Sequence, residues 1–206
     1  MVEERLRKLD GKSLWYFDNV FSFEERERLY SYCLNQKYSL SGSDVQRLET
    51  KGDYNLYCNL SPTDVDNMGI EKLSNYSHIK HHLDDYTITQ ARINLSTIQD
   101  KNRFHCDTGA EHNLTMLYYP NMEWEKSWGG QTLFTNSTND TLEWVSFYIP
   151  GRIILFDGTI PHSINPPTIH SPTHRFSVVI QYGLSLIHIS EPTRPLYISY
   201  AVFCLK

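Results

Sequence analysis

Three residues of the chain have the types and the order that a metal site needs. His105 and Asp107 lie in the run RFHCDTG, and His162 lies in the run DGTIPHS. Two imidazoles and one carboxylate on one side of a cation leave the opposite coordination positions open. This ligand set suits an Fe(II) ion that must also bind a co-substrate and dioxygen. The three residues therefore predict oxidative chemistry, provided that their side chains converge.

A second His-x-Asp pair, His82 and Asp84, occurs in the run KHHLDDY at the end of an expected helix. Residues two apart in a helix point to nearly opposite sides, whereas in a strand they project from the same face. His105 and Asp107 lie in a run for which we expect a strand, so the geometry favours this pair. The remaining histidines that we assign to surface or loop positions are His81, His82, His112, His170 and His174.

Each candidate ligand also has a simpler interpretation. Taken alone, His105 is equally consistent with a buried, hydrogen-bonded histidine, and Asp107 with a turn former before Gly109. The metal-site interpretation is favoured because residue type, residue order and position in the expected strand all agree with it. We expect the large aromatic residues of the following segment to serve hairpin and core packing rather than substrate binding; they are Trp124, Trp128 and Trp144.

A cationic residue follows the candidate ligands. Arg175 lies 13 positions after His162 (175 minus 162) and opens an expected strand, with Ser177 on the same face. A guanidinium offers a fixed fork of donors that suits a carboxylate, and a neighbouring hydroxyl adds another donor. Such an arginine, taken alone, is most often a surface or salt-bridge residue. Beside a metal site it predicts an anionic co-substrate.

The middle and the end of the chain have the pattern of an all-β fold. From Thr87 onward, short runs rich in β-branched and aromatic residues alternate with Gly, Pro, Asn and Asp. These runs predict a mainly β protein, a double-stranded β-helix (jelly roll), with N-terminal helices packed on one sheet. The runs are ITQARINL, RFHCD, NLTMLYY, GQTLFT, LEWVSFYI, RIILF, PHSI and RFSVVIQY.

The first part of the chain is mixed. Ser22 and Glu25 have the form of a capping box, and the apolar residues that follow recur at helical spacing, which predicts a helix over roughly 23–36. A Ser-Pro pair predicts a second helix that starts at Pro62, and an amphipathic stretch then continues to about Leu83.

Length and composition favour one domain. The chain has 206 residues, of which 40% are hydrophobic, and can bury one good core. We expect residues 1–86 to support a catalytic core over residues 87–183. The charged N-terminus predicts neither a secretion signal nor a membrane span, and hence a soluble protein. Four cysteines without a paired short spacing suit a reducing cytoplasm, and a net charge of -5 gives no electrostatic footprint for nucleic acid.

Two longer motifs carry a family resemblance. One is the run WGGQTLF from Trp128 to Phe134, and the other is the run PGRIILFDG from Pro150 to Gly158. Together with the three candidate ligands and Arg175, they resemble the iron(II)- and 2-oxoglutarate-dependent dioxygenases. The likeness is to the prolyl 4-hydroxylase-like branch that is common in bacteria and tailed phages. It extends over residues 87–182.

The resemblance implies a role for each candidate residue. The metal ligands would bind Fe(II), and Arg175, with Ser177, would hold the distal carboxylate of 2-oxoglutarate. Tyr119 and Asn94 are candidates to line the co-substrate site. The cofactors implied are Fe(II), 2-oxoglutarate and dioxygen, with ascorbate as a further one. The metal set implied is His105, Asp107 and His162.

The same resemblance implies a reaction and a setting. The enzyme would hydroxylate an unactivated C–H bond and release succinate and carbon dioxide, with peptidyl proline as the favoured substrate and a small molecule as the other choice. It would work in the cytoplasm of a bacterium or of a phage-infected host, without nucleic acid or membrane partners. Two other classes stay open: a cupin-like metal-binding jelly roll, such as an isomerase, and a structural virion β-sandwich. Neither has a use for Arg175 and Ser177.

The last segment differs from the rest of the chain. After Tyr182 it continues as GLSLIHISEPTRPLYISYAVFCLK, without capping or turn signals that link it to the core. The run SLIHISEPTRP resembles translated sequencing-adapter read-through. We therefore hypothesise that residues 184–206 are not native sequence, and that deleting them leaves folding and turnover intact.

Overall fold

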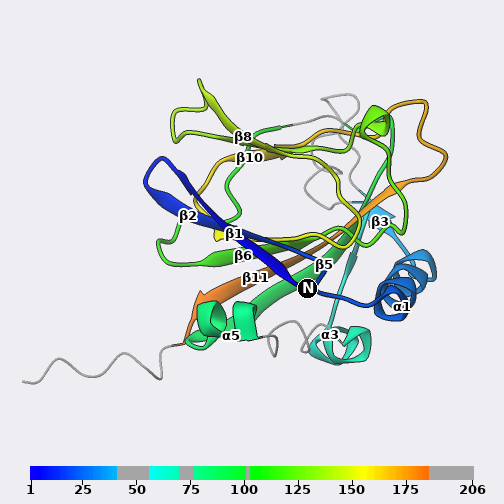
Figure 1. Cartoon of the computed structure of the whole chain (residues 1–206), viewed down its shortest axis with the longest axis horizontal. Helices are drawn as coiled ribbons and strands as arrows, with labels where there is room; N and C mark the ends of the chain where they lie inside the picture. Colours follow the sequence, from blue (N-terminus) through cyan, green and yellow to red (C-terminus); the bar gives the residue numbers. More distant parts are fainter. Residues whose placement is uncertain (41–55, 70–76, 101–102, 186–206) are drawn as a thin grey trace, which may run out of the picture.

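The computed structural model describes residues 1–40, 56–69, 77–100 and 103–185, and its main feature is two antiparallel sheets stacked in layers (Figure 1). In spatial order, the larger sheet contains β1 (Glu3–Leu9), β2 (Lys12–Asp18), β9 (Ile153–Asp157), β6 (Leu114–Tyr118), β11 (Arg175–Leu184), β5 (Tyr86–Ser96), β4 (Leu56–Asn59) and β3 (Ser39–Leu40). The smaller sheet contains β10 (His162–Ile164), β7 (Thr132–Thr135) and β8 (Leu142–Ser146). The mainly β jelly roll expected from the sequence is therefore confirmed.

The helices lie on the side of the larger sheet that faces away from the smaller sheet (Figure 1). They are α1 (Phe23–Leu34), α3 (Pro62–Met68) and α5 (Ser77–Leu83). A separate short 3-10 helix covers Lys126–Trp128. Their packing on one sheet agrees with the expected architecture. Within the described residues, none of the helices is long and apolar enough to cross a membrane.

The first helix starts where its capping box predicts. The Glu25 backbone N–H donates to the Ser22 hydroxyl over 3.2 Å, and the Glu25 carboxylate accepts the Ser22 backbone N–H over 3.0 Å. These two bonds satisfy donors that a helix N-terminus otherwise leaves unpaired. Helix α1 then ends at Leu34, two residues before the predicted end at 36.

The second predicted helix was wrong in its length. Ser61 caps the start at Pro62 as expected, but α3 ends at Met68 because Gly69 adopts a left-handed conformation with φ of 69°. A glycine in this conformation is a common helix terminator, since it has no Cβ to clash. Helix α5 is a separate element, and residues 70–76 lie outside the described residues.

An N-terminal hairpin was not recognised in the sequence. Strands β1 and β2 pair from Glu3 opposite Asp18 to Leu9 opposite Lys12, which leaves a two-residue turn at Asp10-Gly11. Both turn residues have positive φ, 47° and 79°, as the tight hairpin turn requires. Strand β2 then pairs with β9 and so joins the N-terminus to the larger sheet.

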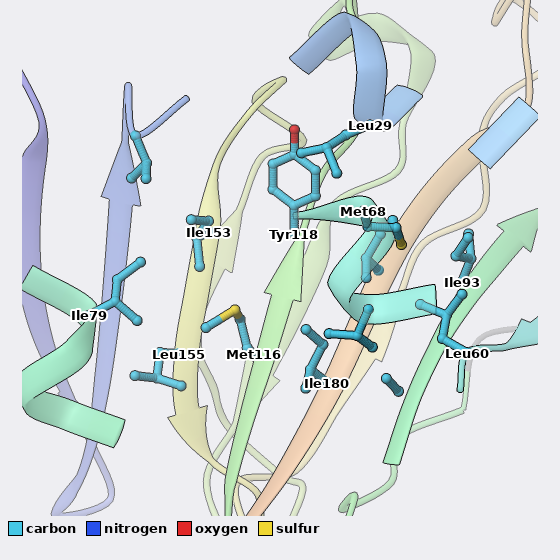
Figure 2. Close-up of a cluster of buried hydrophobic side chains, with 14 of the residues drawn as sticks. Leu29, Leu60, Met68, Ile79, Ile93, Met116, Tyr118, Ile153, Leu155 and Ile180 are labelled. Atoms are coloured by element: carbon cyan, nitrogen blue, oxygen red, sulfur yellow. The ribbon is translucent and has the colours of Figure 1, made fainter. Parts of the chain in front are cut away.

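The strands at the centre of the larger sheet are buried on both faces. Their helix-facing side chains form an apolar cluster with α1, α3 and α5, and Figure 2 shows side chains from this cluster. The cluster includes Leu29, Met68, Ile79, Ile93, Met116, Tyr118, Ile153, Leu155 and Ile180. The alternating residues face the smaller sheet in a second cluster, which includes Leu117, Tyr119, Phe134, Tyr148, Ile154, Phe156 and Val179. The candidate site residues of these strands lie on this second face.

Strand β11 ends close to where the catalytic core was expected to end. The strand runs through Leu184, and the Ser185 backbone N–H donates to the Asp85 carbonyl over 2.7 Å. Leu184 is thus part of the larger sheet, whereas residues 186–206 lie outside the described residues. The hypothesis of a non-native tail stays a prediction.

Candidate functional site

The three candidate metal ligands meet between the two sheets. His105 and His162 form an isolated antiparallel bridge in which each backbone N–H donates to the other residue's carbonyl, over 3.0 Å and 2.9 Å. Their rings lie 4.5 Å apart between centroids. One ligand atom from each of His105, Asp107 and His162 lies within 4.8 Å of the other two. Such a spacing allows all three atoms to bind one ion.

The carboxylate of Asp107 is held between the imidazoles. Its two oxygens lie 3.7 Å from His105 Nε2 and 3.7 Å from His162 Nε2. The Thr115 hydroxyl donates to Asp107 Oδ2 over 2.8 Å, and the Asp107 backbone N–H donates to the Gly158 carbonyl over 2.9 Å. These bonds fix the position of Asp107 and the direction of its carboxylate.

Each imidazole is oriented by a backbone carbonyl. His105 Nδ1 lies 3.1 Å from the Arg103 carbonyl, and His162 Nδ1 lies 3.0 Å from the Ile160 carbonyl. Because a carbonyl only accepts, we assign the proton of each ring to Nδ1, which leaves Nε2 with a free lone pair toward Asp107. Burial lowers the pKa of His162 and favours its neutral form, although the charge of Asp107 opposes this shift.

The segment that carries the first two ligands is not a strand. His105 makes only the bridge to His162, and Asp107 lies in a bend of the backbone. The expected i, i+2 strand geometry was therefore wrong for RFHCD. The polar sequence continues into Thr108 and Gly109 and lacks the apolar alternation that would bury an edge strand. Pairing with β10 and the bond to Gly158 bring the side chains together instead.

Arg175 lies at the other end of this face and is fully buried. Its Nε donates to the Gly130 carbonyl over 2.9 Å, and its Nη2 lies 3.5 Å from the Thr132 hydroxyl. The guanidinium carbon lies 5.3 Å from the ring centroid of Tyr119 and 5.0 Å from that of Tyr148. Burial lowers the pKa of Arg175, but a guanidinium stays protonated in proteins.

Two buried donors at this end have no partner among the described residues. They are Arg175 Nη1 and the Ser177 hydroxyl. Buried polar groups are rarely left unpaired, because desolvating a donor without a hydrogen bond costs free energy. A small anion between the sheets would supply the missing acceptors. This arrangement fits the carboxylate that the sequence predicted beside Arg175.

Tyr119 and Asn94 lie in different positions relative to the Arg175 guanidinium and the Ser177 hydroxyl. The Tyr119 hydroxyl forms a 2.7 Å hydrogen bond with the Thr132 hydroxyl, and Thr132 thus connects it to the Arg175 guanidinium. Asn94 lies opposite Ser177 in the pairing of β5 with β11 and shares its face of the sheet. Both residues therefore lie on the face of the larger sheet that carries Arg175 and Ser177.

Several residues that build the site were not identified from the sequence. The hydroxyl of Thr115 holds Asp107, the hydroxyl of Thr132 lies between Tyr119 and Arg175, and the ring of Tyr148 packs against the guanidinium. A threonine in a strand carries no signal of its own, because β-branched residues are common there. Only the position of Thr132 inside the motif WGGQTLF could have indicated a role.

The backbone conformation and the close contacts of Gly130 require a glycine at this position. Its φ is 77°, and a Cβ at this position would lie 3.0 Å from the Trp124 ring and 3.2 Å from the Arg175 side chain. Its carbonyl accepts the Nε–H of Arg175. The glycine therefore lets the backbone approach the buried guanidinium closely.

The aromatic residues near this end have the packing roles that we expected. Trp124 donates its indole N–H to the Gly129 carbonyl over 3.0 Å, and its ring packs on Tyr148 with centroids 4.6 Å apart. Trp144 stacks on Phe134. One histidine differs from its expected surface role, because His82 is half-buried in α5 and bonds to the Glu4 carboxylate over 3.0 Å.

Comparison with known proteins gives one family match. Residues 70–182 match the family model described as the 2OG-Fe(II) oxygenase superfamily. The matched range covers more than half of the chain and contains every candidate site residue. A comparison with curated protein sequences finds no match.

Solved structures with the same fold include prolyl hydroxylases. One is a prolyl hydroxylase from Trichoplax adhaerens in complex with a hypoxia inducible factor peptide, which has 16% identity and a TM-score of 0.63 over 82% of each chain. A prolyl-4-hydroxylase from Pseudomonas putida has 15% identity and a TM-score of 0.59, over 89% of this chain and 92% of its own. HygX from Streptomyces hygroscopicus, solved with nickel and 2-oxoglutarate bound, has 9% identity and a TM-score of 0.60 over 84% and 83% of the two chains. At these identities the likeness shows a shared fold.

Proposed function

Because this chain belongs to the 2OG-Fe(II) oxygenase superfamily, we propose that its Fe(II) ion is bound by His105, Asp107 and His162. The observation that carries this assignment is the convergence of three ligand atoms within 4.8 Å. Two neutral imidazoles and one carboxylate are the donor set that leaves Fe(II) with open positions on one side. The enzyme is a dioxygenase that uses Fe(II) and 2-oxoglutarate.

The 2-oxoglutarate anchor is Arg175 together with Ser177. The free Nη1 of Arg175 and the free hydroxyl of Ser177 are donors that match the two oxygens of a carboxylate. Tyr119, which follows β6 of the larger sheet, and Thr132 of the smaller sheet keep the guanidinium in place. Asn94, opposite Ser177, lines the same site from β5.

The chain's own contribution to the reaction is orientation. Carbonyls of the backbone hold both rings, Thr115 holds the carboxylate, and the buried anchor sets the direction of the co-substrate. When bound, Fe(II) and 2-oxoglutarate supply the oxidation, in which the co-substrate becomes succinate and carbon dioxide and dioxygen provides the oxygen atom inserted into a C–H bond. The remaining question is which substrate brings that C–H bond to the site.

The substrate is a peptide or a small molecule, and we infer that a prolyl residue of a peptide is the preferred target. Support comes from the shared fold with two prolyl hydroxylases over more than four fifths of their chains. A cupin-like metalloprotein or a structural sandwich would have no need for a buried arginine with an unpaired donor beside a metal site. The observations at Arg175 and Ser177 therefore favour the oxygenase assignment of the site.

A spectroscopic titration tests the assigned ligands. Adding Fe(II) and then 2-oxoglutarate to the protein under argon should produce a weak visible charge-transfer band. Asp107→Ala should abolish this band and also the formation of succinate in air, while the circular dichroism spectrum stays unchanged. The control is His112→Ala, which removes an exposed histidine outside the site. An unchanged band in the Asp107 variant would contradict the proposed metal site.

The substrate class needs a separate measurement. Proline-containing peptides and a panel of free amino acids should be incubated with enzyme, Fe(II), 2-oxoglutarate and air. Mass spectrometry should then detect the gain of one oxygen atom in a prolyl peptide. Oxygen gain in free amino acids alone would contradict the peptidyl assignment and leave the metal and co-substrate assignments intact.

A further inference from the structure

A second arginine shares the face of the sheet that carries the site. Arg92 in β5 lies opposite Val179 of β11, and Ser177 of β11 lies opposite Asn94. Paired residues of antiparallel strands project from the same face, and so do residues two apart in one strand. Arg92 therefore points to the same side as Ser177 and Arg175, toward the smaller sheet.

The strand register places Arg92 beside the metal ligands. Val179 lies opposite Leu117 of β6, and Leu117 is two residues from Thr115, which donates to Asp107. Along β11, Val179 opposite Arg92 thus lies between Ser177 and Gln181, and Gln181 is the residue opposite Thr115.

Arg92, like Arg26 and Arg175, has a buried guanidinium nitrogen without a partner among the described residues. Its Nε is buried and has no hydrogen-bond partner among the described residues, and no ion pair between described residues includes it. Arg152, by contrast, donates two bonds of 2.7 Å and 2.6 Å to the carboxylate of Asp18. A buried donor on a cation is costly without an acceptor, and Arg92 is half-buried, so an anion from outside the chain would supply the acceptor that its Nε lacks.

This anion is not accounted for by the co-substrate. The proposed anchor for the distal carboxylate of 2-oxoglutarate is Arg175, which starts β11 and is held by Gly130 and Thr132. Arg92 lies on the next strand, opposite Val179, which is four residues further along β11 than Arg175 (179 minus 175), toward the metal ligands. The neighbours of Arg92 toward the sheet edge are polar, because Asn59 of β4 lies opposite it and Tyr57 lies opposite Asn94. On the other side, β6 and β9 contribute apolar residues such as Leu117 and Ile154.

We propose that Arg92 binds a carboxylate of the substrate and so selects an anionic substrate for oxidation. The guanidinium fork can donate two parallel bonds to one carboxylate, which fixes both the position and the direction of the bound group. The rim formed by exposed Asn59 and half-buried Asn94 and Tyr57 gives such a substrate polar contacts outside the metal ligands. This inference rests on the proposed function and names a chemical group that the substrate must carry.

Matched pairs of probes test the inference and its two possible sources of carboxylate. The first pair is L-proline and L-prolinamide, which tests the carboxylate of a free amino acid. The second pair is an acetylated, amidated proline peptide with Glu or with Gln beside the proline, which tests an acidic side chain. Binding is measured by calorimetry under argon on the full-length enzyme loaded with Mn(II) and 2-oxoglutarate.

The acidic member of at least one pair should bind about 10-fold or more tightly than its amide, which is the range expected for a hydrogen bond to a charged group. Arg92→Gln should remove this preference and leave the affinity for 2-oxoglutarate unchanged. Arg92→Lys keeps the charge and should retain part of the preference, so it carries the test if the glutamine variant does not fold. The matched control is Arg5→Gln, which changes an exposed arginine of β1.

The outcomes separate this inference from the proposed function. Acidic probes that never bind more tightly than their amides overturn the role of Arg92, as does an Arg92→Gln variant that keeps the preference. An Arg92→Gln variant that loses 2-oxoglutarate instead would make Arg92 part of the co-substrate anchor, and would also overturn the inference. Failure of the wild-type protein to bind 2-oxoglutarate at all would contradict the proposed function itself.

Discussion

The metal end and the anion end of the site are built in different ways. At the metal end, the ligands come from an irregular segment and an edge strand, and 47% of the His105 side chain is exposed. At the anion end, Arg175 begins a regular central strand and is fully buried beneath aromatic rings. The hydrogen bonds of the metal end come from the protein itself, whereas two donors at the anion end have no partner in the described part of the chain. On the proposed assignment, the metal end is oriented before binding, and the anion end would gain its last hydrogen bonds from the co-substrate.

The largest expected contrast is between a ligand and the anchor. His162→Ala should reduce succinate formation to background, because it removes one of the three proposed metal ligands. Arg175→Gln should instead raise the KM for 2-oxoglutarate by about 10- to 100-fold and leave metal affinity unchanged. Steady-state assays and metal titrations measure both effects. Equal loss of metal affinity in the two variants would contradict the division into two ends.

Ligand binding should also stabilise the two ends separately. At 100 times its Kd, 2-oxoglutarate should raise the free energy of unfolding of the Mn(II) enzyme by about 2.7 kcal/mol. Arg175→Gln should lose most of this increase at the same concentration and keep the increase that Mn(II) alone provides. Thermal unfolding with and without each ligand gives the two shifts. A full 2-oxoglutarate shift in the variant would show that the anchor lies elsewhere.

Gly130→Ala sharpens the comparison at the anion end. The added Cβ would lie 3.0 Å from Trp124 and would require a non-glycine residue with φ of 77°. We expect a loss of about 1–2 kcal/mol in the free energy of unfolding, together with weaker 2-oxoglutarate binding. Gly109→Ala is the matched control, because a Cβ there meets nothing within 4 Å. Similar losses in both variants would argue against close approach as the cause.

Thr115→Val tests the orientation of the metal end. The variant removes the hydroxyl that donates to Asp107 and keeps a similar side-chain volume. Loss of such an orienting bond should weaken metal binding by about 10-fold. Thr89→Val, which removes an exposed hydroxyl bonded to the Gln181 carbonyl, should leave the metal Kd unchanged. An unchanged Kd in the Thr115 variant would mean that the backbone alone orients Asp107.

The smallest expected effect belongs to Tyr119→Phe. The variant removes a buried 2.7 Å hydrogen bond to Thr132 and keeps the ring that lies over Arg175. The free energy of unfolding should fall by about 1 kcal/mol, and the KM for 2-oxoglutarate should rise only a few-fold. Chemical denaturation and steady-state assays measure the two changes. A loss as large as that of Arg175→Gln would identify Tyr119 as a direct ligand of the co-substrate.

Local signals in the sequence were sufficient for several elements. The capping box of Ser22 and Glu25 placed the start of α1, and the alternating residues of β11 placed Arg175 and Ser177 on one face. The order of the metal-binding residue types, together with WGGQTLF and PGRIILFDG, was enough to indicate the family. These signals work because they depend on neighbours within a few positions of the chain.

Other features could not be derived from neighbours alone. The segment around His105 was predicted to be a strand but forms only a bridge, and the helix predicted to Leu83 stops at Gly69. The N-terminal hairpin is charged along β1, so its place in the larger sheet depends on pairing with β9 far along the chain. The role suggested for Arg92 likewise depends on strands β11 and β6 beside it.

The amino-acid sequence thus determined the donor types, their order and the alternation that separates the two faces of the larger sheet, since these follow from residue chemistry and backbone period. Only the tertiary structure decided which donors meet and which stay unpaired. His105 contacts His162 through a bridge between segments 57 positions apart (162 minus 105), and Arg175 is buried by aromatic residues from other strands. Convergence and burial depend on contacts between distant segments, which local chemistry does not specify.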